Sequence, residues 1–286
     1  MADKPSRGLV FYGDGLIQFV TPSHTYLHEF ASRGICGFLS LPQAPPAESK
    51  EERVVREFAV LLDAYESYIS RSGKDSSTSS VPTISERFMG LKAAVLTNDS
   101  AVKSFAEFLG FTGVQFDDLS TNSLLRLLGF QDEKVLETSD FDLVFVHIGS
   151  KDVELINGFI GGVMQAVQYG SDISSRLHLS VVMSYGAVSE NDDSLLNFSL
   201  QEEVTPDVSM LVPRQSYTIS KESAYKARHH CPMLIAQWQE AVTRTDTAES
   251  FSFKEFKENG ANLAIPADRF LHEVAFKLWK APKYGA

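Results

Sequence analysis

Two acidic residues follow apolar strand-like runs, and both are of a type that binds metal ions. Asp14 stands between two glycines after the first apolar run, and Asp152 follows the apolar run 141–149. If these strands are parallel neighbours, their carboxyl ends meet at one crevice, where open α/β sheets bind ligands. His229 or His230 would add an imidazole, and such a donor set suits Mg²⁺ or Mn²⁺. Each aspartate equally suits a tight turn or a helix cap.

One serine is placed as a candidate nucleophile. Ser49 precedes a helical pattern, and Glu52 follows it three residues later. This Ser-x-x-Glu spacing is a capping box, in which the serine accepts a hydrogen bond from a backbone N–H. A hydroxyl nucleophile needs a metal or a base to activate it, and the sequence assigns neither to Ser49. The spacing therefore favours the cap over the nucleophile.

Apolar strands alternate with helical patterns along the chain, and these elements must position the candidate residues. Nearly continuous apolar strands are typical of a mostly parallel sheet with helices on both faces. The sequence therefore predicts a three-layer α/β/α fold in a single domain over 1–286. The Ser-rich stretch 71–83 is predicted to be a mobile loop within it. Strands are predicted at 9–12, 35–41, 91–99, 141–149, 177–186 and 230–238, and the longer helices at 21–34 (capped by Thr21, with Pro22 first), 50–70, 100–110, 153–169 and 266–280.

The composition of the chain indicates which kinds of partner and which cellular compartment to expect. The 286 residues carry a formal net charge of −11, which argues against a nucleic-acid or anionic-membrane partner, because either would need a basic stripe. The two cysteines, Cys36 and Cys231, provide neither a disulfide framework nor the spacing of a zinc site. The N-terminus lacks the apolar core of a signal peptide, and no apolar run has membrane-spanning length. The expected setting is cytoplasmic, and a nuclear one is also compatible.

Four stretches, in order along the chain, resemble the alkaline phosphatase superfamily. They are YGDGL with TPSHTYLHEFASRGICGFL, then LKAAVLTNDSAVKSFAEFLGF, then FDLVFVHIGSKD, and finally RHHCPMLI. The resemblance is strongest to the cofactor-independent phosphoglycerate mutase branch, where an Asp-Gly is followed by Thr-Pro, a Leu-rich helix and Gly-x-x-Gly-Leu. The matches cover most of the chain and imply the same three-layer α/β fold.

In that family, Asp and His residues hold two divalent metals, and a Ser or Thr attacks phosphate. The resemblance implies that Asp14 is the first metal-binding Asp and that Asp152 is the Asp after the central strand. It places His229 or His230 at the late metal-binding His. Ser49, in the stretch PPAESK, aligns best with the loop that carries the nucleophile.

About half of the family's expected ligands are missing. Where family members place a Gly-His after the central Asp, this chain has VELIN, and the family's later Asp-His pair is replaced by Ser184 and Tyr185. Affinity for hard metals depends on how many anionic ligands converge. We therefore expect at most one Mg²⁺ or Mn²⁺ and no other cofactor.

These observations favour a catalytically degenerate phosphatase- or mutase-like domain that acts by binding a protein or a phosphorylated ligand. The alternative is a metal-dependent phosphomonoesterase or phosphomutase with one metal at Asp14 and Asp152. Such an enzyme would use Ser49 or a water as nucleophile, and cations would have to stabilise the phosphoryl oxygens. Lys151 and Arg228 are the candidates for phosphate binding, with Lys50 beside the candidate nucleophile. A Rossmann-like domain whose resemblance to the family is accidental is a third interpretation.

Overall fold

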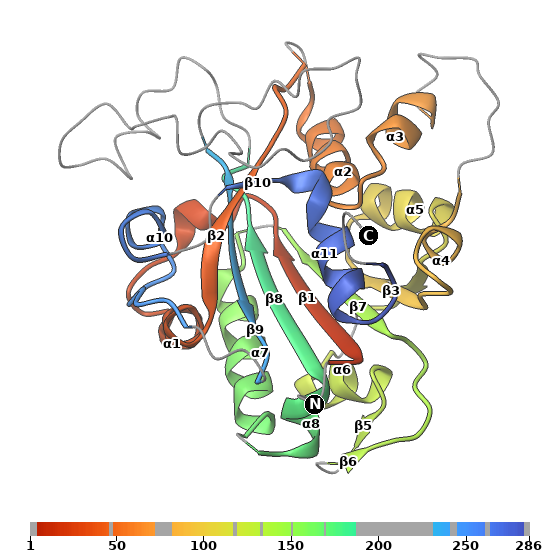
Figure 1. Cartoon of the computed structure of the whole chain (residues 1–286). Helices are drawn as coiled ribbons and strands as arrows, with labels where there is room; N and C mark the ends of the chain where they lie inside the picture. The colour runs from red at the N-terminus through yellow and green to blue at the C-terminus, as the bar shows by residue number, and fades with distance from the viewer. Residues whose placement is uncertain are drawn as a thin grey trace.

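The structure, a computed structural model, describes residues 5–45, 48–71, 82–116, 119–131, 134–149, 151–168, 170–186, 231–240, 245–260 and 264–282. Within these residues, eight strands form one sheet in the order β10-β2-β9-β8-β1-β7-β3-β4 (Figure 1). The strands are β1 (Arg7–Gly13), β2 (Ile35–Ser40), β3 (Ala93–Leu96), β4 (Thr112–Val114), β7 (Leu143–Ile148), β8 (Leu177–Met183), β9 (Met233–Trp238) and β10 (Ile265–Pro266). A separate antiparallel pair is formed by β5 (Phe130–Gln131) and β6 (Lys134–Val135).

The sheet is mixed but mostly parallel, as the sequence predicts. Strand β9 runs antiparallel to both of its neighbours, β2 and β8, whereas the other strand pairs of this sheet are parallel. Strand β1 lies at the centre, with β7 on one side and β8 on the other. The first strand of the chain, β1, is therefore a direct neighbour of both β7 and β8.

Helices cover both faces of this sheet, which confirms the predicted α/β fold (Figure 1). Helices α1 (Thr25–Arg33), α6 (Thr121–Leu127), α7 (Val153–Ala166), α8 (Asp172–Arg176) and α10 (Phe253–Asn259) pack on one face. Helices α2 (Lys50–Leu61), α4 (Ile84–Arg87), α5 (Ser100–Phe108) and α11 (Phe270–Lys277) pack on the other. Helix α3 (Tyr65–Arg71) and the short 3₁₀ turns η1 (Ile17–Phe19) and η3 (Ala267–Arg269) complete the described helices.

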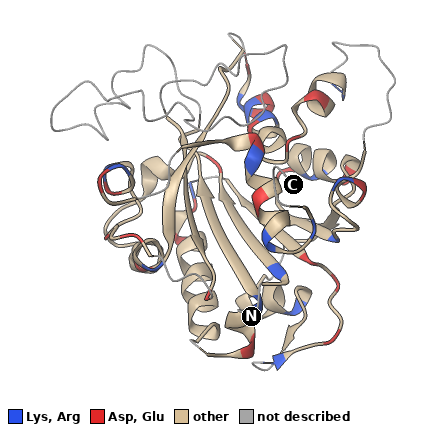
Figure 2. Cartoon of the chain, in the orientation of Figure 1, with Lys and Arg blue, Asp and Glu red and all other residues tan. Residues whose placement is uncertain are grey.

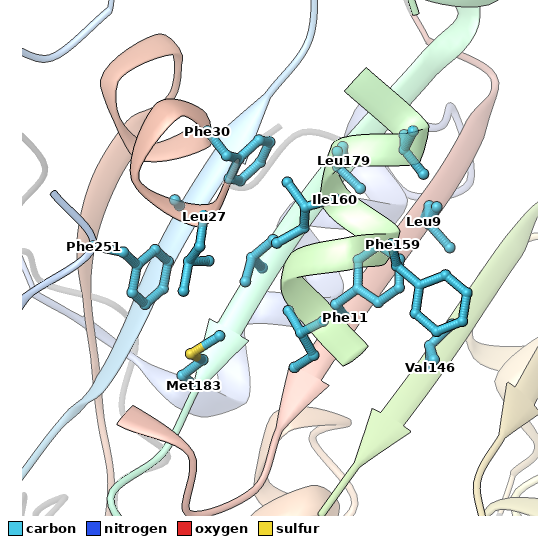
Figure 3. Close-up of a cluster of buried hydrophobic side chains, with 14 of the residues drawn as sticks. Leu9, Phe11, Leu27, Phe30, Val146, Phe159, Ile160, Leu179, Met183 and Phe251 are labelled. Carbon is cyan, nitrogen blue, oxygen red and sulfur yellow. The ribbon is translucent and has the colours of Figure 1, made fainter. Parts of the chain in front are cut away.

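Alternation along β1 supplies apolar side chains to both layers of the core. Successive side chains of a strand point to opposite faces, so Leu9 and Phe11 pack beneath α1 and α7, whereas Val10 and Tyr12 pack beneath α2. Figure 3 shows the first of these layers, in which Phe11 stacks on Phe159 of α7 with ring centroids 5.8 Å apart. Both layers are mostly apolar, and buried polar side chains such as His147 of β7 and His178 and Ser180 of β8 are the exceptions.

Two helices differ from their predicted bounds. Thr21 and Pro22 belong to a turn rather than to the first helix, because the backbone N–H of His24 bonds back to the Thr21 carbonyl. Helix α1 therefore begins at Thr25, with His24 at the N-cap. The helix predicted over 50–70 is two helices, because Asp63 adopts a left-handed backbone with φ of 50° between α2 and α3.

Other predicted segments end earlier or lie outside the described chain. Helix α7 stops at Ala166, three residues before the predicted end. In the Ser-rich stretch, residues 72–81 lie outside the described residues, and Arg71 is the last residue of α3. In the described chain no helix is long and apolar enough to cross a membrane.

Charged residues are concentrated on the helices and connecting segments, whereas the strands are nearly free of them (Figure 2). Helix α2 differs from the other helices because several of its charged side chains are buried. Three of its charged residues are almost completely removed from solvent: Arg53 at 5% exposure, Arg56 at 1% and Glu57 at 0%. Buried charges are costly unless they are paired, so this helix marks the place where the structure departs from an apolar core.

Candidate functional site

The carboxyl ends of β8, β1 and β7 meet at one edge of the sheet, as the sequence predicts. Asp14 follows β1 there, and its backbone N–H bonds to the carbonyl of Ile148 at the end of β7. The turns after β1 and β8 touch through two glycines, Gly15 and Gly186, with φ of 66° and 82°. A Cβ atom on Gly186 would lie 3.1 Å from the Cα of Gly15. Only glycines permit this close backbone approach, which fixes the geometry around Asp14.

Both carboxylate oxygens of Asp14 are bonded to one guanidinium group. Nη1 of Arg53 lies 2.7 Å from Oδ1, and Nη2 lies 3.0 Å from Oδ2. The two side chains are each only 7% exposed. Paired N–H donors matched to a carboxylate in this way form the strongest kind of ion pair in proteins. Arg53 therefore places a permanent positive charge directly on the carboxylate that was predicted to bind a metal.

Two charged residues of α2, Arg56 and Glu57, and Glu48 just before the helix complete a buried ionic cluster. Nη1 of Arg53 also donates to Oε2 of Glu57, at 3.0 Å and one helical turn away. Arg56 donates to Glu48 at 2.6 Å and lies 3.8 Å from Glu57. We define the Asp14 cluster as Asp14, Glu48, Arg53, Arg56 and Glu57. Its three carboxylates and two guanidinium groups leave it one negative charge in excess.

The pKa shifts around this cluster follow its burial and its negative charge. Burial disfavours the charged form of Arg53, but the bond to Asp14 and the charge of Glu57 outweigh it and raise the pKa of that guanidinium. Burial, followed by the charges of Asp14 and Glu57, raises the pKa of the neighbouring Tyr12 hydroxyl well above its ordinary value. Tyr12 is therefore a neutral phenol, and Arg53 stays charged at all relevant pH values.

Ser184 connects Asp14 to the end of β8. Its hydroxyl accepts a hydrogen bond from the backbone N–H of Gly15 at 2.9 Å and donates to Oδ1 of Asp14 at 3.3 Å. The side chain is completely buried. Where the resembled family has an acidic ligand, this chain thus has a hydroxyl that holds the first aspartate in place.

His147 lies in β7 as a register partner of Tyr12 in β1. The histidine is 4% exposed, and its Nδ1 lies 2.7 Å from the Thr97 hydroxyl. Burial lowers the pKa of His147, although the charge of Asp14 acts in the opposite direction. This neutral histidine was not among the predicted site residues, because an apolar strand surrounds it in the sequence.

Ser49 is the N-cap of α2. The backbone N–H of Glu52 donates to its hydroxyl at 3.2 Å, and the Glu52 carboxylate accepts from the backbone N–H of Ser49 at 2.9 Å. The capping box predicted from the sequence is therefore present. Ser49 is exposed, and among the described residues no member of the Asp14 cluster forms a hydrogen bond with its hydroxyl.

Replacing Ser49 distinguishes its two candidate roles. We expect Ser49→Ala to lower the free energy of unfolding by about 1 kcal/mol, because an N-cap is lost. Ser49→Asp keeps a capping oxygen and should retain the stability of the parent protein. Urea unfolding curves provide the measurement. If Ser49 were a nucleophile instead, both replacements would abolish turnover of a phosphate ester, whatever their stability.

Asp152 and Lys151 lie in the segment between β7 and α7. Asp152 is exposed and is the N-cap of α7, accepting a hydrogen bond from the backbone N–H of Leu155 at 3.0 Å. Lys151 is exposed and has its Nζ 5.1 Å from the ring centroid of Phe19. The carboxylates of Asp14 and Asp152 thus bond to helices that cover opposite faces of the sheet.

The remaining predicted residues, Arg228, His229 and His230, lie outside the described residues. Within the described ranges, no group of three or more His, Cys, Asp or Glu side chains is arranged to hold a metal ion. Asp14 in particular has both of its oxygens bonded to Arg53. The described side chains therefore do not present the donor set that a divalent metal needs at Asp14.

Comparison with known proteins bears on the fold. No model of a protein family matches the sequence, and no curated protein matches it. Among solved structures, the PH0037 protein from Pyrococcus horikoshii is 15% identical over 100% of both chains, with a TM-score of 0.56. The cofactor-independent phosphoglycerate mutase from Thermoplasma acidophilum DSM 1728 is 11% identical over 96% of this chain and 99% of its own, with a TM-score of 0.48. The chain thus shares the fold of the PH0037 protein over its whole length.

Proposed function

We propose that this chain is a catalytically degenerate phosphatase- or mutase-like domain that acts by binding a partner. The observation that carries the proposal is the paired contact between Asp14 and Arg53, at 2.7 and 3.0 Å. The sequence resemblance assigns Asp14 as a metal ligand, and a guanidinium group now takes both oxygens that a metal would use. The cation of the site is supplied by the chain itself.

The chemistry of the cluster supports the loss of hydrolysis. A metal ion activates a nucleophile and stabilises charge that develops on phosphoryl oxygens. A guanidinium can stabilise charge but cannot lower the pKa of a bound hydroxyl by ligation. Three of the five N–H donors of Arg53, all on Nη1 and Nη2, are moreover bonded to Asp14 and Glu57, and the side chain is only 7% exposed. It therefore has little capacity to contact a phosphoryl group.

The charge balance favours a protein over a phosphorylated molecule as the partner. Recognition of a phosphate requires cations or N–H donors free to contact it. The Asp14 cluster holds one more carboxylate than guanidinium, and both guanidinium groups are bonded to carboxylates. A phosphate would therefore meet repulsion at this edge of the sheet.

A metal analysis combined with an assay of turnover tests the proposal. The full-length protein, purified without chelator and dialysed against Mn²⁺, should retain far less than one equivalent of metal. It should also hydrolyse an aryl phosphate no faster than the Asp14→Asn variant, which serves as the matched control. Stoichiometric Mn²⁺ together with turnover that Asp14→Asn abolishes would instead establish the metal-dependent phosphomonoesterase.

A further inference from the structure

Four aromatic side chains of α3 and α5 form a continuous row whose two ends reach the surface. Tyr65 stacks on Tyr68, with ring centroids 6.1 Å apart. Tyr68 meets the buried ring of Phe105 edge to face at 6.3 Å, and Phe105 contacts Phe108 at 6.3 Å. The end members, Tyr65 and Phe108, are 39% and 45% exposed. We call these four side chains the aromatic row. Contiguous exposed rings of this kind mark surfaces that bind a partner.

The Phe108 end of the aromatic row already holds a guanidinium group. Cζ of Arg71 lies 5.4 Å from the ring centroid of Phe108. Nη1 and Nη2 of the same arginine donate to the carbonyl and hydroxyl oxygens of Ser104, at 2.9 and 2.7 Å. The flat face of the guanidinium is thus directed at a ring while its N–H groups reach oxygen atoms, a combination that arginine favours over lysine.

The other end of the aromatic row lies beside the first turn of α2. The Tyr68 hydroxyl lies 3.5 Å from the backbone carbonyl oxygen of Glu52. Burial raises the pKa of Tyr68, and the charges of Glu48 and Glu52 raise it further. Glu48 also belongs to the Asp14 cluster, through its bond to Arg56. The aromatic row is therefore continuous with the site already described.

Negative charge is in excess around Tyr65. The exposed charged side chains in the first turns of α2 and α3 are three acidic and one basic: Glu51, Glu52, Glu66 and Lys50. Figure 2 shows acidic residues on α3, which packs against α2. The two ends of the row thus differ in charge. Arg71 supplies a cation at the Phe108 end, whereas carboxylates surround the Tyr65 end.

We propose that the Tyr65 end of the aromatic row binds an arginine side chain in an extended basic segment of a partner protein. The guanidinium lies on the exposed ring of Tyr65 and donates to Glu51 or Glu66, just as Arg71 lies on Phe108 and donates to Ser104. The inference rests on the proposed function, in which the domain binds a protein, and it names the chemistry of that protein.

The same contacts exclude the other charged partners. A guanidinium matches a carboxylate with two parallel N–H donors and also stacks on an aromatic face. A lysine ammonium is compact and strongly hydrated, so it gains less from the ring. An acidic segment would be repelled by Glu51, Glu52 and Glu66. Arginine is therefore the side chain that uses both the ring and the carboxylates.

Titration of the full-length protein with labelled peptides tests the proposal. A short peptide of repeated Gly-Ser-Arg units should bind saturably, and its affinity should fall as salt is added, because exposed charges are screened. The Gly-Ser-Lys peptide should bind more weakly, and the Gly-Ser-Glu peptide should not bind. Fluorescence anisotropy measures all three. No saturable binding of the arginine peptide, or equal binding of the arginine and glutamate peptides, would overturn the proposal.

Two replacements locate the binding site. Tyr65→Ala should weaken binding of the arginine peptide by at least about twofold to fivefold, the contribution of an exposed cation–π contact. Tyr26→Ala is the matched control, because Tyr26 is 41% exposed on α1, which packs on the opposite face of the sheet. Equal effects of the two replacements would contradict the assignment.

Glu66→Gln provides a variant that preserves the shape of an exposed side chain, and it decides if Tyr65→Ala fails to fold. We expect about twofold to fivefold weaker binding and a smaller dependence on salt. Glu258→Gln, at an exposed position of α10, should change neither quantity. Unchanged binding by Glu66→Gln would remove the carboxylates from the proposed contact.

Sedimentation and the metal assay distinguish the remaining outcomes. A dimer of the parent protein that Tyr65→Ala dissociates would show that a second copy covers the aromatic row, and it would overturn the proposal. Absence of peptide binding in a protein that also lacks Mn²⁺ and turnover would overturn the partner chemistry alone. Peptide binding by a protein that retains Mn²⁺ and hydrolyses an aryl phosphate would support the docking surface and contradict only the proposed loss of catalysis.

Discussion

Replacing Arg53 by methionine is expected to lower the free energy of unfolding by about 3–5 kcal/mol, because it leaves the buried Asp14 carboxylate without its counter-charge and removes one of the two guanidinium groups beside Glu57. Methionine keeps much of the volume of the aliphatic chain but removes every donor. Asp14 and Glu57 would then face each other with side-chain exposures of 7% and 0%. Chemical unfolding at neutral pH, with the slope of the transition compared between variants, provides the measurement.

A matched control separates this effect from the loss of any arginine. Arg33 also forms an ion pair with a glutamate one turn away, Glu29, but both side chains are about half exposed. Arg33→Met should therefore change the free energy of unfolding by no more than about 0.5 kcal/mol. Equal effects of the two replacements would contradict the structural role of Arg53.

The double variant Arg53→Met with Asp14→Asn tests the coupling. Neutralising Asp14 removes the carboxylate that loses its counter-charge in Arg53→Met, so the pair of changes should cost less than the sum of the single ones. Side chains in direct contact give such non-additive effects. If the effects of the two changes on the free energy of unfolding were strictly additive, the 2.7 Å contact between Asp14 and Arg53 would contribute little to stability.

Much of the fold could be predicted from the sequence because its signals are local. The run Leu143–Ile148 is apolar at every position except His147, as is typical of a strand covered on both faces, and it forms β7. Gly34 ends α1 as predicted. The break between α2 and α3 could not be predicted, because Asp63 in its left-handed conformation interrupts an apolar spacing that continues into the next helix.

The candidate site was predicted only in part because its decisive contact is non-local. Asp14 was identified from its place after β1, whereas Arg53 is 39 residues away and bonds to it only when α2 packs on the sheet. One local signal did exist. Glu57 stands three residues after Val54 and four before Leu61, on the apolar stripe of α2. A charge on such a stripe needs a partner, and Arg53, one turn earlier, is the residue in reach.

Acidification is expected to destabilise the protein well before its carboxylates titrate, because two histidines are buried in the neutral form. His178 in β8 is completely buried, and its Nε2 lies 3.0 Å from the hydroxyl of Ser180. Burial, followed by the charge of Lys277, lowers the pKa of His178 well below its ordinary value. Burial likewise lowers the pKa of His147.

The sign of the effect follows from where the protons bind. Below a pH of about 6.5 the unfolded chain takes up a proton on each histidine, while the folded chain does not until its lower pKa is reached. The stability present above that pH is therefore lost as the pH falls. Each histidine contributes a loss of at most about 1.4 kcal/mol per pH unit, so the two together give up to about 2.8 kcal/mol per pH unit.

Unfolding by urea at about pH 7.5, 6.5 and 5.5 measures this slope. The window is chosen because burial raises the pKa of Asp268 and Glu273, and these groups oppose the loss at lower pH. His178→Gln should reduce the slope more than His147→Gln, because Asp14 partly counteracts the effect of burial on His147, whereas Lys277 reinforces it on His178. Equal stability of the parent protein at about pH 7.5 and 5.5 would contradict the burial of these histidines in the neutral form. Equal slopes in the two variants would contradict the opposing effects of the Asp14 and Lys277 charges on the two pKa values.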